Sequence, residues 1–179
     1  TATATEPTPP VITYLETPTD EQRRVVEWAV ERYAEAGLTL PSLEISFPVT
    51  CGGKAGRYFV GQARIELCKV HRKTMLHELA HAWDDSTSLD RTGFLHERGL
   101  DHWYEQPDER SNESGGEQLA LSITWGLMDV DLTHPTAEWA GQPIDDQPRR
   151  LPGLADDTPP VLAALFTQLT GTSPLARSH

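Results

Sequence analysis

The chain has 179 residues, a formal net charge of −12 and a pI of about 4.9. Such an acidic chain lacks the basic footprint that binds nucleic acid or anionic membranes, so we expect neither as a partner. No apolar run approaches the roughly 20 residues that a membrane-spanning helix needs. The length allows one domain with a real core, and we expect a monomer.

Residues 1 to 18 are rich in Thr and Pro, a composition that buries too little apolar area to fold. We expect a flexible tail there and a single domain over residues 19 to 179. Because the chain begins with Thr1 rather than Met, we also expect that a preceding segment was removed by processing or by design.

The first helix is predicted over residues 20 to 36. Thr19 and Gln22 have the spacing of a capping box, apolar residues then recur at helical spacing, and Gly37 supplies a stop signal. Residues 43 to 47 alternate apolar and polar side chains, which predicts a half-buried strand.

A hairpin is predicted next. Residues 51 to 56 are rich in glycine and indicate a turn, and residues 57 to 60 and 63 to 68 are strand-like runs. The exposed edge of the strand nearest the following helix could hydrogen-bond an extended peptide, although an ordinary sheet edge has the same pattern.

The two cysteines, Cys51 and Cys68, flank this hairpin. A disulfide between them would close the turn and indicate an oxidising compartment, so we expect a secreted or cell-surface protein. Two alternatives are a reduced pair and a role for Cys68 as a metal ligand, since it lies nine residues before His77.

The sequence His77-Glu-Leu-Ala-His81 lies in a segment with an apolar side, as expected of a helix packed into a core. Residues four apart return to nearly the same helix face, so both imidazoles can bind one metal ion, and Glu78 is offset by about 100°. Zinc accepts imidazole nitrogens and leaves a position for water, whose proton a nearby carboxylate can take. The alternative is a polar helix face without a metal.

Residues 88 to 114 form a long segment with several aromatic side chains, and such segments are usually functional or carry a short element. A helix is predicted from Ser114 to Met128. Residues 129 to 158 are rich in Pro, Asp and Gly and are expected to wrap the surface. A last amphipathic helix is predicted to begin at Pro159 or Pro160 and to end at Thr170, before Gly171.

Catalytic zinc usually has three protein ligands, so a third must join the two histidines. The candidates are Glu117, Glu113, Asp84, Asp85, His96, His102 and Cys68. We prefer Glu117, because the apolar stripe of its helix must pack in the same core as the helix that carries both histidines. The alternative for Glu117 is a capping box with Ser114. Asp84 and Asp85 are better suited to orient an imidazole.

The motif at His77 to His81, followed by Glu117-Gln-Leu-Ala120 on a second apolar helix, resembles the gluzincin arrangement of zinc metallopeptidases. The order of elements over residues 40 to 128 resembles the minigluzincin-like peptidases. The resemblance implies a zincin-like α+β fold with a small mixed sheet of about three strands packed on the HExxH helix and on a glutamate-bearing helix. It also implies His77, His81 and Glu117 as zinc ligands. Leu121 stands where the family usually has an acidic residue.

The predicted function is a zinc-dependent metallopeptidase that hydrolyses peptide bonds, with Glu78 as the general base. A developing oxyanion needs a further donor, for which we select His102 and Tyr104, with His96 and Tyr58 as other candidates. One alternative is a zinc amide hydrolase of a non-protein substrate, similar in outline to peptide deformylase, which uses a cysteine ligand. Another is a catalytically silent binding or regulatory module.

Overall fold

The computed structural model describes residues 9–105, 114–128 and 158–175. The described residues form a mixed α+β fold with a four-stranded sheet and five helices. The strands are β1 (Ile12–Tyr14), β2 (Leu43–Ser46), β3 (Gly56–Phe59) and β4 (Arg64–Leu67). The helices are α1 (Asp20–Glu35), α2 (Arg72–Ser86), α3 (Arg91–Arg98), α4 (Gly115–Leu127) and α5 (Pro159–Thr170).

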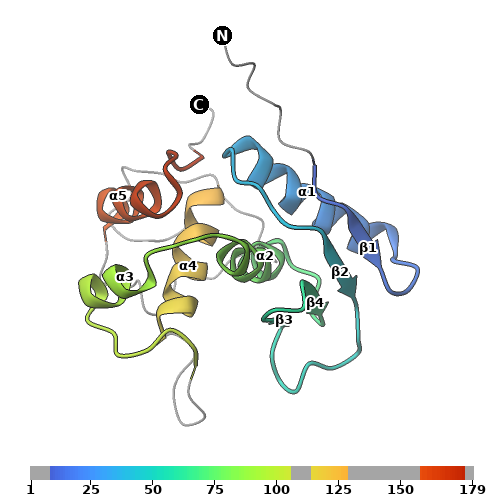
Figure 1. The fold of residues 1–179 in the computed structure, drawn as a ribbon. Helices are drawn as coiled ribbons and strands as arrows, with labels where there is room; N and C mark the ends of the chain where they lie inside the picture. The colour runs from blue at the N-terminus through green and yellow to red at the C-terminus, as the bar shows by residue number, and fades with distance from the viewer. Residues whose placement is uncertain (1–8, 106–113, 129–157, 176–179) are drawn as a thin grey trace.

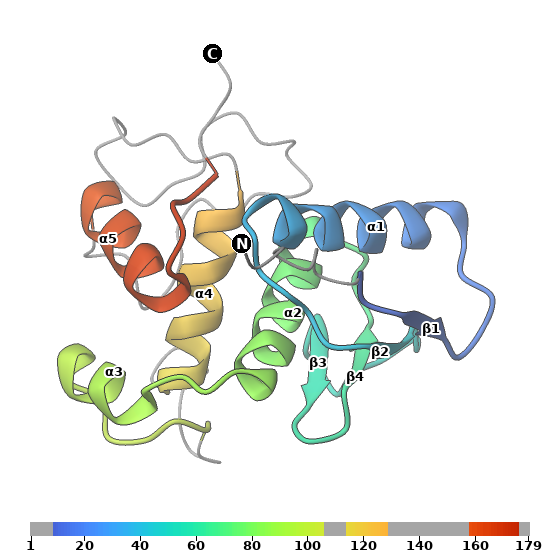
Figure 2. The ribbon, with the colours of Figure 1, turned by 45° about the horizontal axis from the view of Figure 1, so that its top comes forward.

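The sheet has the strand order β1-β2-β4-β3, so β1 and β3 are its two edges. Strand β2 is parallel to both of its neighbours, and β3 is antiparallel to β4. Helix α2 lies between this sheet and α4, and α5 packs on the other side of α4 (Figures 1 and 2). The edge strand β3 is therefore placed beside the helix that carries the histidine motif.

Strand β1 was not expected, because its residues lie in the stretch predicted to be a flexible tail. Ile12 and Tyr14 are partly buried against the core, and Leu43 N donates a 2.9 Å hydrogen bond to the Val11 carbonyl. A parallel strand needs a partner far along the chain, here about 31 residues away, and the local composition does not encode that partner. The sheet consequently has four strands where about three were predicted.

Helix α1 is hydrogen-bonded to both α2 and α4. Its N-terminus carries the predicted capping box of Thr19 and Gln22. The fully buried Tyr33 donates a 2.9 Å hydrogen bond from its hydroxyl to the carbonyl of Leu76 on α2. Arg32 donates a 2.8 Å hydrogen bond from Nε to the carbonyl of Leu127 at the end of α4. These bonds fix α2 and α4 relative to α1.

The long segment after α2 carries an element of its own, helix α3, which ends at Gly99 in the left-handed conformation. Helix α5 begins with Pro159 and ends before Gly171, as predicted. The predicted surface wrap, except for Thr158, lies outside the described residues. Within the described parts of the chain, no helix combines the length and the apolar character needed to cross a membrane.

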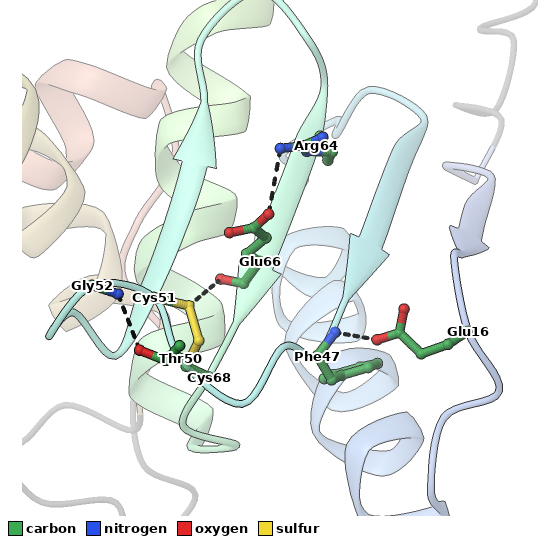
Figure 3. Close-up of a disulfide and its surroundings, with 8 residues drawn as sticks. All are labelled: Glu16, Phe47, Thr50, Cys51, Gly52, Arg64, Glu66 and Cys68. Carbon is green, nitrogen blue, oxygen red and sulfur yellow. Dashed lines mark hydrogen bonds and ion pairs between the residues drawn. A yellow bond between two sulfur atoms is a disulfide. The ribbon is translucent and has the colours of Figure 1, made fainter.

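The predicted disulfide between Cys51 and Cys68 is present, with a Cα–Cα distance of 5.9 Å (Figure 3). It joins the turn before β3 to the end of β4. The carbonyl of Ala55 accepts hydrogen bonds from Cys68 N at 2.9 Å and Lys69 N at 2.8 Å, which holds the same two segments together. Cys68 is thereby removed from the candidate metal ligands, and the start of β3 is anchored.

Candidate metal centre

Two helices bring three candidate ligands together. Nε2 of His77 and Nε2 of His81, both on α2, lie 3.2 Å apart. The Glu117 carboxylate, in the first turn of α4, places Oε2 at 3.0 Å from His77 Nε2 and Oε1 at 3.4 Å from His81 Nε2. This group of two histidines and one glutamate could hold a metal ion.

The separations of these ligand atoms agree with a tetrahedral zinc site. With metal–ligand distances of about 2.0 to 2.2 Å, two ligands on a tetrahedron lie roughly 3.3 to 3.6 Å apart. The observed separations of 3.0 to 3.4 Å therefore need only small outward shifts. The donor set of two imidazoles and one carboxylate also suits zinc, so the residues present fit this metal.

The charges of the three ligands support one another. Burial alone would raise the pKa of Glu117, but hydrogen bonds and charges from His77 and His81 outweigh it, so this pKa lies well below its usual range. Burial alone would lower the pKa of His81, but the Glu117 carboxylate more than compensates, and the pKa of His81 is raised. The site therefore holds an ionised carboxylate beside two imidazole rings, and this negative charge favours a cation, which a metal ion can supply.

Glu78 is not one of the three candidate ligands. Its side chain is buried, with the residue 6% exposed, and this burial raises the pKa of its carboxyl group. The charges of His77 and His81, and to a smaller extent the backbone N–H of Tyr58 on β3, partly oppose the effect of burial on this pKa. A carboxylate with a raised pKa is suited to accept a proton near neutral pH.

The site opens into a cavity of about 580 Å³. Helix α2 contributes the two histidines and Glu78 to its lining, and α4 contributes Glu117 and Leu121. The remaining walls come from the turn before β3, from β3 and the following Val60, from Arg91 at the start of α3 and from residues 103 to 105. A volume of this size accommodates a peptide segment or a similar small substrate.

A buried aspartate organises one wall of the cavity. Asp84, which is 4% exposed, accepts hydrogen bonds from Arg91 Nε at 3.2 Å, Arg91 Nη2 at 3.1 Å and Trp103 Nε1 at 3.0 Å. Arg91 Nη1 also donates to the Tyr104 hydroxyl at 3.1 Å. The end of α2 is thus bonded to the segment that carries Tyr104.

The same segment is bonded to the start of α4. The carbonyls of His102 and Trp103 accept hydrogen bonds from the backbone N–H groups of Gly115 and Gly116, each at 2.9 Å. Residues 102 to 104 therefore connect the end of α2 to the first turn of α4, close to Glu117. This connection helps to fix the distance between the histidines and the glutamate.

A second aspartate joins α2 to the hairpin. Oδ2 of Asp85 accepts hydrogen bonds from the Tyr58 hydroxyl and from Gly61 N, both at 2.7 Å. Burial and this bond to Asp85 raise the pKa of the Tyr58 hydroxyl well above its usual range. Neither Asp84 nor Asp85 belongs to the group of candidate ligands, because each is engaged by other donors.

The remaining predicted residues fall in different places. Tyr104 lines the cavity and is 49% exposed, whereas His102 lies beside it along the chain but is not part of the lining. His96 lies on α3, outside the cavity lining, and Glu113 lies outside the described residues. The capping box with Ser114, the alternative role for Glu117, is absent from the start of α4, because Ser114 makes no side-chain cap hydrogen bond. The Glu117 carboxylate instead contacts the histidines.

Two contributors to the site were missed by sequence reasoning. Arg91 carries no motif, although its position directly after the helix cap Asp90 could have suggested an ordered segment. Gly56 was interpreted as a turn residue, and nothing in the sequence indicated that it packs against Glu78. Both depend on contacts between separate elements, which sequence spacing does not specify.

Comparison with protein-family models, curated proteins and solved structures found no match for this chain. Its function is therefore inferred from the residues of the site.

Proposed function

We propose that this chain is a zinc-dependent metallopeptidase of the gluzincin type, with a zincin-like domain. The observation that carries the proposal is the convergence of His77, His81 and Glu117 at one point of the cavity, with Glu78 beside them as a second, separately held acidic group. A purely structural metal site would have no use for a buried carboxylate with a raised pKa at this position.

In this proposal each residue of the site has a distinct catalytic role. His77, His81 and Glu117 hold the metal. When bound, zinc lowers the pKa of a coordinated water and polarises a nearby carbonyl group. Glu78 accepts a proton from the attacking water at its carboxylate and passes it to the departing amine nitrogen. Tyr104, whose hydroxyl oxygen accepts a hydrogen bond from Arg91, is the described residue best placed to donate to a developing oxyanion.

A peptide is the substrate that fits this cavity best. Strand β3 is an edge of the sheet and forms part of the cavity wall, so main-chain groups on its open side can bind an extended chain. The lining also contains the aromatic residues Trp103 and Tyr104, which offer apolar surface to a substrate side chain.

One alternative loses its support. A zinc amide hydrolase similar to peptide deformylase would require a cysteine ligand, and both cysteines are joined in the disulfide. A silent binding module remains the competing proposal, and Glu78 is the residue that separates the two. The disulfide also supports our proposal that the chain is secreted or displayed at a cell surface.

The test combines metal analysis with cleavage of an unstructured protein such as casein. The zinc-loaded chain is expected to cleave it, and Glu78→Gln is expected to keep one zinc ion per chain and to lose at least about a hundredfold in rate. The matched control is Glu97→Gln, which changes an exposed glutamate on α3 that lies outside the cavity lining and accepts a hydrogen bond from Gln168. Equal activity of Glu78→Gln and the wild-type chain would rule out the proposed role of Glu78.

A further inference from the structure

Strand β3 packs directly against the Glu78 side chain at a glycine. A Cβ added to Gly56 would lie 2.8 Å from Oε1 and 2.9 Å from Cγ of Glu78, and 3.0 Å from Cγ2 of Thr74. Real Cβ atoms do not approach other atoms so closely, and both neighbours belong to α2. The missing side chain at Gly56 therefore leaves the space that Glu78 occupies.

The same strand also turns a main-chain N–H toward this carboxylate. Tyr58 lies two residues after Gly56, so the two residues share one face and one edge orientation of β3. Cys68 N donates to the Ala55 carbonyl, so the alternation of hydrogen-bonded pairs along β3 and β4 points the Tyr58 N–H away from β4. On that side the N–H favours the ionised form of the Glu78 carboxylate. Gly56 thus leaves space for Glu78, and Tyr58 directs a main-chain N–H toward it.

Asp85 holds this arrangement in place from the far end of the helix. It lies seven residues after Glu78, two helical turns along α2 and on nearly the same face. Its Oδ2 atom binds the Tyr58 hydroxyl and Gly61 N, both at 2.7 Å. Tyr58 is therefore bonded to α2 through its side chain, and its backbone N–H faces Glu78 on the same helix.

We infer that strand β3 fixes the position of the catalytic base. Gly56 and Tyr58 are positioning residues for the Glu78 carboxylate, and the hydrogen bonds of Asp85 hold β3 against α2. This inference rests on the proposed function for its catalytic meaning. It goes further by separating two tasks, because α2 and α4 hold the metal ligands whereas α2 and β3 hold the base. A substrate strand that pairs with the open edge of β3 must then use main-chain groups other than the Tyr58 N–H.

The positioning of Glu78 by β3 is tested without any assay of activity. The measurement is hydrogen exchange of the Tyr58 amide, followed by NMR on the full chain with and without zinc. In Glu78→Ala, this amide is expected to exchange roughly tenfold faster or more, because it loses its acceptor. The matched control is Glu117→Ala, which removes another carboxylate of the same cavity and should leave the Tyr58 amide unchanged. Equal exchange of the Tyr58 amide in Glu78→Ala and the wild-type chain would overturn the inference.

The positioning role is tested by the kinetics of Gly56→Ala in the zinc-loaded protein. The added methyl group should displace Glu78, so kcat is expected to fall about a hundredfold while KM and the zinc stoichiometry stay unchanged. Wild-type kcat in a folded Gly56→Ala variant would overturn the role, as would a loss confined to KM. If this variant does not fold, the exchange measurement decides the inference by itself.

The proposed peptidase function and the positioning of Glu78 by β3 are contradicted by different results. A wild-type chain that binds zinc but cleaves no peptide bond would contradict the proposed function, and the exchange experiment would still decide whether β3 holds Glu78. If the wild-type chain is active but the Tyr58 amide exchanges equally in Glu78→Ala, only the inference that β3 positions Glu78 is contradicted.

Discussion

His77 and Glu117 stand 40 positions apart in the sequence, yet Nε2 of the histidine and Oε2 of the glutamate lie 3.0 Å apart. The first residue belongs to α2 and the second to the opening turn of α4, so the site exists only where the two helices meet. The predictions below follow from this meeting of α2 and α4 and from the segments that maintain it.

Zinc affinity should depend on Glu117. Because it supplies one of three ligands, Glu117→Gln is expected to weaken zinc binding by roughly a hundredfold or more, measured by competition with a chromogenic chelator. The control Glu97→Gln should bind zinc as the wild-type chain does. Unchanged affinity in Glu117→Gln would assign the third ligand to another residue, while the two histidines could still bind the metal.

Zinc affinity should also fall as the pH is lowered, and the fall should begin above the range of an ordinary histidine. The neutral imidazole binds zinc, so below the pKa of His81 the metal must displace a proton, at a cost of about tenfold in affinity per pH unit. Although burial opposes it, Glu117 raises this pKa, and the carboxylate itself stays ionised over the same range.

Titration of zinc affinity between about pH 5 and pH 8 measures this dependence. In Glu117→Gln the anionic partner is lost, so the fall should begin at a lower pH than in the wild-type chain. An identical pH dependence in the two proteins would show that Glu117 does not act on His81.

Asp84 should contribute to stability through the wall of the cavity. Asp84→Ala removes the acceptor for Arg91 and leaves the N–H of the buried Trp103 without it. The expected loss is about 2 to 3 kcal/mol in the free energy of unfolding, measured with urea. The guanidinium of Arg91 is partly exposed and can regain water, which is why the loss stays below that of a fully buried pair. A loss under about 0.5 kcal/mol would contradict this role.

The contact between α4 and α5 depends on the absence of a side chain at Gly126. A Cβ at this position would overlap the ring of Phe166, which is fully buried. Gly126→Ala is expected to destabilise the fold by about 1 to 3 kcal/mol in thermal or urea unfolding. The smaller side chain in Phe166→Leu should make the same glycine substitution less costly, whereas additive losses would show that the two residues do not interact.

The sequence predicted the local elements well, because their signals are local. The capping box at Thr19 and Gln22, the stop at Gly171 and the disulfide flanking the hairpin are all present. The pair His77 and His81 also followed from helical spacing alone. In each case the residues that decide the structure are close together along the chain.

Long-range features were harder to predict. Strand β1 exists because Ile12 and Tyr14 find a parallel partner in β2, which no local pattern specifies. The place of Gly56 against Glu78, and the bonds of Asp84 to Arg91, depend on how the helices pack. The choice of Glu117 was correct as a neighbour of the histidines, but its alternative role as a cap could be dismissed only with the structure.

The most direct test of the account is the first coordination shell in a crystal structure of the zinc-loaded chain, located by anomalous scattering at the zinc edge. We predict one zinc ion bound by His77 Nε2, His81 Nε2 and the Glu117 carboxylate, with a further position free of protein ligands and with Glu78 beside it. A zinc ion with four protein ligands, or one bound without Glu117, would contradict the proposed two-helix catalytic centre.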